Sequence, residues 1–255
     1  MKKQWVKWLY REEEVTPYTH LAALYDKVMD HVDYSQWADF IVTLFQRFGS
    51  DVYRVIDGGC GTGSLLKVLN QREIEIAGFD RSIDMIQIAK KKVGVPLWVD
   101  DLRNFYIKKR WDAFLCLYDT IQYLTVKEIQ KLLCDVGRTL MPGGLFIFDA
   151  VTKEHILRYW ANYTERVESD KLEMLRRSWY VKKTQSQHTE FEIFDCCNEH
   201  IYREHHIQYI YPLETFIKVS GESGLKLIGQ FQDFTLNPGN EKADRIHFVF
   251  KREPT

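Results

Sequence analysis

A glycine-rich turn separates an apolar strand from a helix near residue 60. Between Val55 and Leu66 the chain reads V-I-D-G-G-C-G-T-G-S-L-L, in which Gly59, Gly61 and Gly63 follow the spacing G-x-G-x-G. Such a turn lets the backbone approach a ligand closely and points the N-terminus of a helix at it. The dinucleotide fingerprint is G-x-G-x-x-G, and counted from Gly61 its third glycine would fall at Leu66. The spacing therefore disfavours a nicotinamide-dependent dehydrogenase.

Acidic side chains recur at the ends of the predicted strands. Asp57, Asp80, Asp101, Asp119 and Asp149 all stand at or just past such ends. In an open α/β sheet the ligand crevice lies outside the carboxyl ends of the strands. Each acid taken singly is compatible with a helix cap or a turn. Five of them in the same edge position predict a wall of a binding site.

The elements that position these acids alternate between strands and amphipathic helices. Apolar residues spaced along one face predict a helix over 35–48 with Ser35 as its cap. Thr125 and Glu128 predict a capping box at the start of another helix. Strands are predicted over 53–57, 74–80, 95–101, 111–119 and 145–150. This alternation predicts a mostly parallel sheet with helices on both faces.

The pattern of the chain changes after Thr152. A helix is predicted over 154–163, and the three runs that follow alternate between polar and apolar residues, which is typical of antiparallel strands. We expect residues 165–211 to form an inserted antiparallel β lid for a substrate. Residues 1–164 and 212–255 are then expected to form the cofactor-binding domain, with residues 1–50 as an N-terminal helical cap.

Composition argues against several classes of protein. Lys and Arg number 35 against 36 Asp and Glu, so the basic excess of a general nucleic-acid binder is missing. The five cysteines form no C-x-x-C pair, which predicts neither a metal site nor a disulfide framework. No run approaches the ~18 apolar residues of a membrane span, and no apolar stretch of signal length stands at the start. We expect a cytoplasmic protein, as a monomer or homodimer, without nucleic-acid or membrane partners.

The motifs together resemble those of class I S-adenosylmethionine-dependent methyltransferases. D-G-G-C-G-T-G is similar to the cofactor loop of that family, G-F-D-R-S-I-D-M-I-Q-I-A-K to its second motif and V-D-D-L-R-N-F to the segment that meets the adenine. R-T-L-M-P-G-G-L-F-I-F-D resembles the turn and fifth strand of the family, and Gly58 departs from the apolar residue usual after the first Asp. The resemblance implies an α/β, Rossmann-like, doubly wound and mostly parallel seven-stranded sheet. It also implies S-adenosyl-L-methionine as cofactor and S-adenosyl-L-homocysteine as product.

The resemblance assigns roles to the residues of the glycine turn. Gly59, Gly61 and Gly63, with Cys60 among them, are expected to pass under the amino-acid end of the cofactor. Asp57 is expected to order the turn and to reach the cofactor ammonium through water.

Further roles fall on the segments after the other strands. Asp80 is expected to bind the two ribose hydroxyls, since a carboxylate accepts both hydrogen bonds. Asp101 and the backbone of Leu102 are expected at the adenine amine. The remaining residues expected beside the cofactor are Arg81 and Met85 at the adenine, and Tyr118 and Asp119 at the methionine portion.

The acceptor side is less constrained, and the resemblance implies only a small polar molecule with an amine or a hydroxyl. A base is needed when the acceptor is a protonated amine or a hydroxyl. Tyr25, Tyr34 and His206 are the candidate catalytic side chains. Ordinary aromatic packing is the alternative for the two tyrosines, and a structural role is the alternative for His206.

Two other functions stay open from the sequence. One is a module that binds S-adenosylmethionine without catalysis, although the complete glycine turn with Asp80 and Asp101 argues against it. The other is a methyltransferase acting on RNA or protein. Enzymes that methylate nitrogen in nucleic acids usually show [D/N]-P-P-[Y/F] after the fourth strand, whereas this chain reads L-Y-D-T-I-Q-Y-L.

Overall fold

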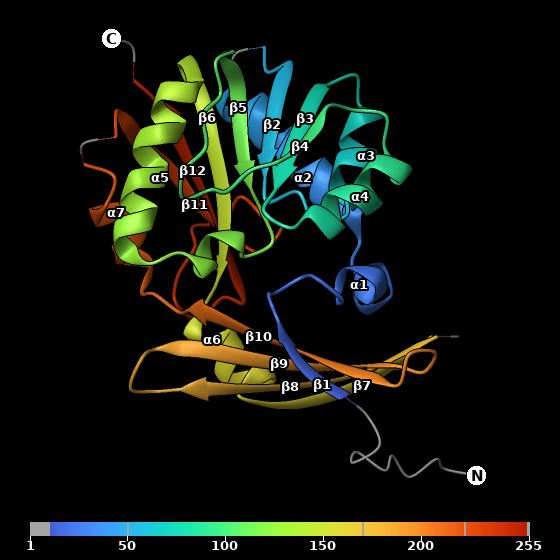
Figure 1. Ribbon diagram of the computed structural model, residues 1–255. Coiled ribbons are helices and arrows are strands. Elements are labelled where there is room, and N and C mark those ends of the chain that lie inside the picture. The colour runs from blue at the N-terminus through green and yellow to red at the C-terminus, as the bar shows by residue number, and fades with distance from the viewer. Residues whose placement is uncertain (1–10, 50, 170, 222, 254–255) are drawn as a thin grey trace.

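The chain folds into two β-sheets, one above the other (Figure 1). The computed structural model describes residues 11–49, 51–169, 171–221 and 223–253. The larger sheet carries helices on both faces, and the smaller sheet lies beyond the carboxyl ends of its parallel strands. The carboxyl ends of the parallel strands therefore face the smaller sheet.

The larger sheet has the strand order β11-β12-β6-β5-β2-β3-β4 in the described part of the chain. Its strands are β2 (Arg54–Gly58), β3 (Glu75–Asp80), β4 (Leu97–Val99), β5 (Trp111–Cys116), β6 (Leu140–Val151), β11 (Leu225–Gln232) and β12 (Arg245–Arg252). The strands β4, β3, β2, β5 and β6 run parallel, while β12 is antiparallel to both β6 and β11. Because β2 has β3 on one side and β5 on the other, the strand order reverses there, which is where such sheets bind ligands. The predicted α/β fold class is confirmed.

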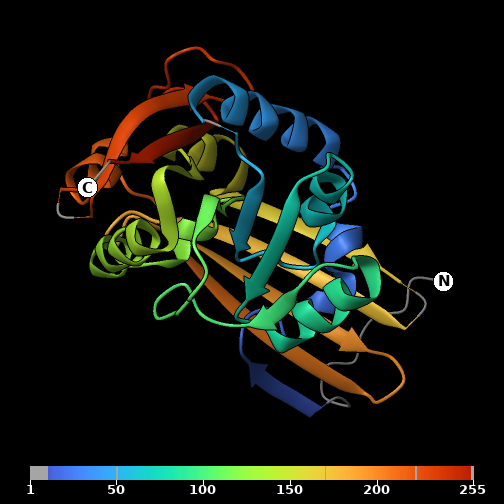
Figure 2. The ribbon, with the colours of Figure 1, turned by 90° about the horizontal axis from the view of Figure 1, so that it is seen from above.

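Helices cover both faces of this sheet. Viewed from above, α2 and α5 lie on opposite sides of it (Figure 2). The helices are α1 (Ala22–Val28), α2 (Tyr34–Phe48), α3 (Ser64–Asn70), α4 (Ile83–Lys92), α5 (Val126–Thr139) and α7 (Leu213–Lys218), with a 3₁₀ turn η2 (Thr120–Tyr123). The apolar residues of α2 and α3 pack in one core layer and those of α5 and α7 in another. Alternating elements bury both faces of the parallel strands, as the sequence pattern requires.

Of the two helix caps predicted from the sequence, one is confirmed and one is wrong. The Thr125 side chain accepts from the Glu128 N–H, and the Glu128 side chain accepts from the Thr125 N–H, so the predicted capping box is confirmed. Ser82 caps α4 by accepting from the Met85 N–H. The cap predicted at Ser35 is wrong, because Asp33 accepts from the Gln36 N–H. The carboxylate of Asp33 supplies the oxygen that the first turn needs.

The smaller sheet has the strand order β1-β10-β9-β8-β7 in the described residues. Its strands are β1 (Arg11–Val15), β7 (Asn162–Glu168), β8 (Leu172–Val181), β9 (Ser186–Asp195) and β10 (His200–Tyr209). The strands β7 to β10 form an antiparallel meander, and β1 joins its edge in parallel to β10. The three alternating runs of the sequence correspond to β8, β9 and β10.

Two segments differ from the sequence expectations. The N-terminal 50 residues, expected as a helical cap, contain the strand β1 as well as α1 and α2, and residues 1–10 lie outside the described part. The helix predicted over 154–163 is shorter and irregular, because α6 (Lys153–His155) continues as a π-helical turn η3 (Ile156–Trp160). The strand β7 then begins at Asn162, which pairs with Trp179 of β8. None of the described helices has the length and apolar composition needed to cross a membrane.

Candidate active site

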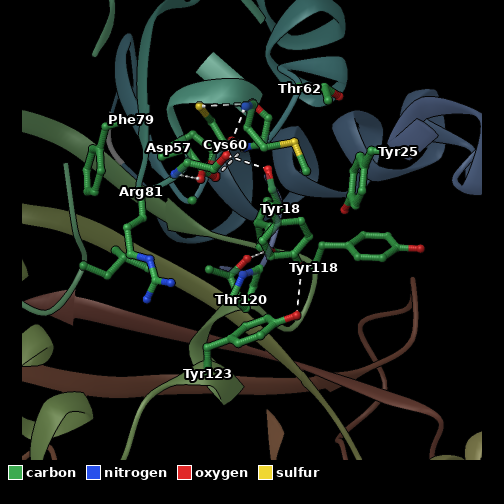
Figure 3. A pocket seen from close by; sticks show the side chains of 18 of the residues that line it. Tyr18, Tyr25, Asp57, Cys60, Thr62, Phe79, Arg81, Tyr118, Thr120 and Tyr123 are labelled. Carbon is green, nitrogen blue, oxygen red and sulfur yellow. Dashed lines mark hydrogen bonds between the residues drawn. The ribbon is translucent and has the colours of Figure 1, made fainter. Parts of the chain in front are cut away.

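A cavity of about 350 Å³ opens at the carboxyl edge of the parallel strands (Figure 3). Its walls come from the turns after β2, β3 and β5, the segment after β4, the N-terminal segment and strand β10. Most of the residues singled out from the sequence line it: Tyr25, Tyr34, Asp57, Gly59, Cys60, Gly61, Asp80, Arg81, Met85, Asp101, Leu102 and Tyr118. Segments far apart in the chain therefore meet at one edge of the sheet.

The glycine turn is held under the cavity by hydrogen bonds to the end of β3. Gly59 adopts a φ of 83° and Gly61 a φ of 55°, a left-handed region that side chains disfavour. The N–H of Gly59 donates to the Phe79 carbonyl at 2.8 Å, and a Cβ at Gly59 would lie 2.5 Å from Cγ2 of Thr120. A Cβ at Gly61 would meet no described atom within 4 Å, so this backbone faces open space. Only the first of these glycines is enforced by close packing as well as by φ.

Asp57 is a buried carboxyl group with an unused oxygen. Its Oδ1 is shielded from solvent and accepts no hydrogen bond from a described residue. Burial, together with the negative charges of Asp80 and Asp149, raises the pKa of Asp57 to about 7. An isolated buried carboxylate is costly, so this oxygen is prepared for a cationic donor that enters the cavity.

Asp80 uses both of its oxygens to shape the turns around the cavity. Oδ2 accepts from the Gly61 N–H at 2.9 Å, and Oδ1 accepts from the Ser82 N–H at 2.8 Å. Each oxygen keeps a further lone pair. Burial raises the pKa of Asp80, although these backbone hydrogen bonds oppose the rise.

Asp101 differs from Asp80 because a neighbouring cation holds it. Arg103 Nε donates to Asp101 Oδ1 at 2.9 Å, and the Arg103 N–H donates to the same oxygen. Burial raises the pKa of Asp101, but the hydrogen bonds and charge of Arg103 outweigh it, so the pKa is lowered overall. Asp101 is an acceptor-only group at this rim of the cavity.

Five tyrosines line the cavity: Tyr18, Tyr25, Tyr34, Tyr118 and Tyr123. Burial raises the pKa of Tyr34 to about 12 and raises those of the other four as well. Their phenols are therefore protonated at neutral pH and present hydroxyl groups to the cavity. Tyr118 also adopts a φ of 61° in the turn after β5, which is uncommon for a bulky side chain.

A chain of hydrogen bonds leads from the cavity into the smaller sheet. The Tyr18 and Tyr123 hydroxyls are 2.7 Å apart, and the Tyr123 hydroxyl lies 2.9 Å from Nδ1 of His206. Nε2 of His206 lies 3.2 Å from Oε2 of Glu204. Glu204 is fully buried and accepts from the N–H groups of Tyr18, His20 and Leu21, which ties the N-terminal segment to β10.

Four residues singled out from the sequence do not line the cavity: Asp119, Asp149, Gly63 and His206. Asp119, expected near the methionine portion, accepts instead from Arg245 at 2.8 Å and from the Gln208 side chain. Its charge, with that of Asp149, balances the guanidinium of Arg245, which contacts both acids. Gly63 occupies the N-cap position of α3 with a φ of 75°, where the glycine turn ends and the helix begins. His206 is 3% exposed and lies behind Tyr123, whereas its neighbour His205 lines the cavity.

Comparisons with known proteins agree with this geometry. Residues 55–144 match the model of a family described as a methyltransferase domain. The chain carries a class I S-adenosylmethionine-dependent methyltransferase domain. A Bacillus subtilis (strain 168) protein provisionally named methyltransferase YqeM is 25% identical over 246 residues, which cover 93% of this chain and 98% of that protein.

Two further relatives of the methyltransferase are informative. A dTDP-4-amino-2,3,4,6-tetradeoxy-D-glucose N,N-dimethyltransferase from Saccharopolyspora spinosa is 29% identical over 119 residues, covering 46% of this chain and 48% of that protein. A crystal structure of a S-adenosylmethionine-dependent methyltransferase from Clostridium acetobutylicum superposes with a TM-score of 0.78 at 22% identity, covering 93% of this chain and 99% of the other. At this identity the superposition shows a shared fold.

The cavity of the methyltransferase fits S-adenosylmethionine in two respects. The amino-acid end of that cofactor carries an ammonium, which is the donor that the buried Oδ1 of Asp57 lacks. The open space over Gly61 lets a ligand lie against the backbone.

Sequence reasoning missed three members of the hydrogen-bond chain beside the cavity of the methyltransferase. Tyr18, Tyr123 and Glu204 come from the N-terminal segment, the turn after β5 and strand β10, and they meet only in the folded chain. The neighbouring pair His205 and His206 was the available signal, because alternate strand residues face opposite sides. Nothing in the sequence indicates that a tyrosine stands between His206 and the cavity.

Proposed function

We propose that this methyltransferase moves a methyl group from S-adenosylmethionine to the nitrogen of a small amine. The observation that carries the proposal is the unpartnered Oδ1 of Asp57 in a cavity lined with tyrosine hydroxyls. The choice of an amine is supported by the Saccharopolyspora spinosa relative, whose name describes an N,N-dimethyltransferase of an amino sugar.

The cofactor is assigned to the wall formed by the parallel strands. Asp57 would accept from its ammonium, and the backbone at Gly59 and Gly61 would lie against its amino-acid end. Asp80 would bind the ribose hydroxyls with the lone pairs that Gly61 and Ser82 leave free. The residues assigned to the adenine end are Asp101, Leu102, Arg81 and Met85, with Cys60 below the sulfur-containing portion.

The reaction needs alignment more than acid catalysis. When bound, S-adenosylmethionine supplies a methyl group on a positively charged sulfur, so no proton has to reach the leaving group. Tyr25, Tyr34 and Tyr118 would orient the acceptor, since their protonated hydroxyls both donate and accept hydrogen bonds. Positioning of this kind contributes up to ~7–11 kcal/mol to lowering a barrier. We further propose that the sheet around β8–β10, with the predicted lid at 165–211, keeps water out.

A protonated amine must first lose a proton, and the buried chain of hydrogen bonds offers a path. Burial lowers the pKa of His206, against the opposing influence of Glu204, while Arg176 and His205 lower it further, so the imidazole is neutral at neutral pH. In the tautomer that we propose, Glu204 accepts from Nε2–H, which leaves Nδ1 to accept from Tyr123. The amine proton would pass to the Tyr18 oxygen, the Tyr18 proton to Tyr123 and the Tyr123 proton to His206.

Binding and turnover test the proposal separately. Calorimetry with S-adenosylhomocysteine should show binding, and Asp80→Ala should weaken it roughly 10- to 100-fold through lost charge-assisted hydrogen bonds. Asp84→Ala is the matched control, because Asp84 lies in the first turn of α4 and outside the cavity lining. Absence of binding at millimolar ligand, or unchanged affinity in Asp80→Ala, would overturn the cofactor assignment.

The acceptor is tested with cofactor carrying a labelled methyl group. Matched panels of amines and of alcohols should show transfer to amines. Transfer only to RNA or to protein would refute a small acceptor, and binding without transfer to any class would favour a non-catalytic module.

A further inference from the structure

A second cavity, of about 710 Å³, opens between α1 and the strands β7 and β8. Its lining includes Trp160, Tyr163 and Arg176 from the smaller sheet and its approach, and Lys27 and His31 from the α1 side. Helix α1 lies at both cavities, since it contributes Tyr25 to the first and Lys27 to the second. No role in cofactor binding accounts for this second space.

Arg176 is the unusual residue of the second cavity. Its side chain is only 17% exposed, yet its guanidinium makes no hydrogen bond to any described residue, and its buried Nε lacks an acceptor. The contact to Glu165 is a distant one, with 3.9 Å between Nη1 and Oε2. The guanidinium instead lies against the Trp160 ring, 4.2 Å from its centroid. A guanidinium has five N–H donors in a fixed fork that matches a carboxylate or a phosphate.

The next residue of the strand, Arg177, differs from Arg176 because its guanidinium has carboxylate partners. Arg177 points to the opposite face, where it donates to Glu190 at 2.6 Å and contacts Glu192 at 3.0 Å. Arg176 has only the distant Glu165 carboxylate as a counter-ion, and burial lowers its pKa. A buried cation that makes no hydrogen bond to an acceptor is costly, so the N–H donors of Arg176 are open to an anion.

We propose that Arg176 binds the anionic group, a carboxylate or a phosphate, of the methyl acceptor. The acceptor is then an amine that carries a negatively charged group, and this inference rests on the proposed function. Arg176, Phe191 and Glu204 stand side by side across β8, β9 and β10, so Arg176 shares a face of the smaller sheet with the Glu204 end of the hydrogen-bond chain.

The charge of Arg176 also reaches the first cavity. It acts on the Tyr18 and Tyr123 phenols, which line that cavity. To reach the methyl group, an acceptor held at Arg176 would have to extend toward these tyrosines.

The other charges of the second cavity restrict where an anion binds. Asp30 and Glu168 repel an anion along the remaining wall, and Glu165 lies 3.9 Å from Nη1 of Arg176. Arg166 of β7 also lines the cavity, but it is exposed to solvent. Lys27 already donates to the Glu168 carbonyl. Arg176, with its aromatic neighbours Trp160 and Tyr163, is therefore the position at which an anion gains most.

Nuclear magnetic resonance of the arginine Nε–H groups tests the site without turnover. The Arg176 signal is assigned by its loss in Arg176→Lys, with Arg177→Lys as the matched control on the opposite face. With S-adenosylhomocysteine present, inorganic phosphate, acetate and chloride are titrated in turn. The Arg176 signal should shift saturably with phosphate or with acetate, and whichever binds more tightly identifies the anion. A signal unmoved by either, or moved equally by chloride, would overturn the proposal.

Turnover with paired acceptors gives the second test. Ethanolamine is compared with phosphoethanolamine, glycinamide with glycine, and glucosamine with glucosamine 6-phosphate. The anionic member should be preferred roughly 10- to 100-fold in kcat/KM, and Arg176→Lys should reduce that preference without changing the affinity for S-adenosylhomocysteine. Equal use of both members by the wild type would overturn the proposal. If no amine is methylated, the proposed function fails, while the anion titration still decides whether Arg176 is an anion site.

Discussion

The buried carboxyl group of Asp57 makes stability and cofactor binding depend on pH in opposite directions. Burial, and then the charges of Asp80 and Asp149, raise its pKa from 3.8 to about 7. A rise of this size corresponds to about 4 kcal/mol. Because the folded-state pKa is raised, the stabilising contribution is complete below pH 4 and is lost as the pH rises through 7. The free energy of unfolding should therefore fall across this window through Asp57.

Asp57→Asn removes the contribution of Asp57 to the pH dependence of the free energy of unfolding, so comparison with wild type measures that contribution. The side chain stays similar in shape and carries no charge at any pH. Relative to wild type, the free energy of unfolding of the variant should rise by about 2–3 kcal/mol between pH 5 and pH 8. Urea unfolding of the ligand-free proteins at both pH values gives this difference. The shifts of other buried carboxyls are common to both proteins and largely cancel.

The same carboxyl should govern binding of S-adenosylhomocysteine. With a pKa near 7, about one tenth of Asp57 is ionised at pH 6, so wild-type affinity should be about tenfold weaker at pH 6 than at pH 8. Calorimetry in phosphate and in Tris buffer should count nearly one proton released on binding at pH 6. Asp57→Asn should bind more weakly, and its affinity should not change with pH.

Asp39→Asn is the control, because Asp39 is an exposed carboxylate on α2 that pairs with Arg72 at the surface. It should change the unfolding free energy by at most ~1 kcal/mol and leave ligand affinity unaltered. Equal wild-type affinity at pH 6 and pH 8, or an unfolding difference that does not grow with pH, would refute the reasoning about Asp57.

Three further predictions concern the turn, the hydrogen-bond chain and a cap. Gly59→Ala should lower stability by about 1–3 kcal/mol and weaken S-adenosylhomocysteine binding, because φ is 83° and the new Cβ meets Thr120 at 2.5 Å; unchanged urea unfolding would contradict this. Tyr123→Phe should lower kcat roughly 10²-fold at neutral pH without altering cofactor affinity, and activity should recover as rising pH deprotonates the free amine; a loss independent of pH would indicate a purely structural hydroxyl. Thr125→Ala should cost about 1 kcal/mol in urea unfolding with kcat unchanged, and a loss of activity at full stability would contradict a role confined to the cap of α5.

The cofactor side of the site was predictable because it depends on local pattern and sheet topology. The glycine turn, Asp80 and Asp101 follow successive parallel strands, and parallel strands bring their carboxyl ends to one edge. Each of these side chains needs only its own strand and turn to reach the cavity. The Thr125–Glu128 box was predictable for the same reason, since it lies within four residues.

The acceptor side depends on contacts between distant segments, which periodicity does not reveal. Asp119 stands at a strand end like the other acids. Its carboxylate accepts a hydrogen bond from Arg245, which lies 126 residues later in the chain, and does not line the cavity. His206 and His205 point to opposite faces of β10, as strand alternation predicts, yet Tyr123 of η2 stands between His206 and the cavity. The strand β1 was missed because its sequence R-E-E-E-V has almost no apolar residues, and only its pairing with β10 makes it a strand.

The pairing of β1 with β10 has a consequence for synthesis of the chain. Arg11 pairs with His200 and Val15 with Glu204, so this strand has no partner until some 190 residues later. At 5–20 residues per second, the ribosome takes about 10–40 s to deliver β10. During that time an apolar strand would be a template for aggregation. The unpaired strand carries a negative charge from Glu12, Glu13 and Glu14, which disfavours pairing with other chains. In the folded protein the same charges lie on the edge strand of the smaller sheet, where they disfavour edge-to-edge association.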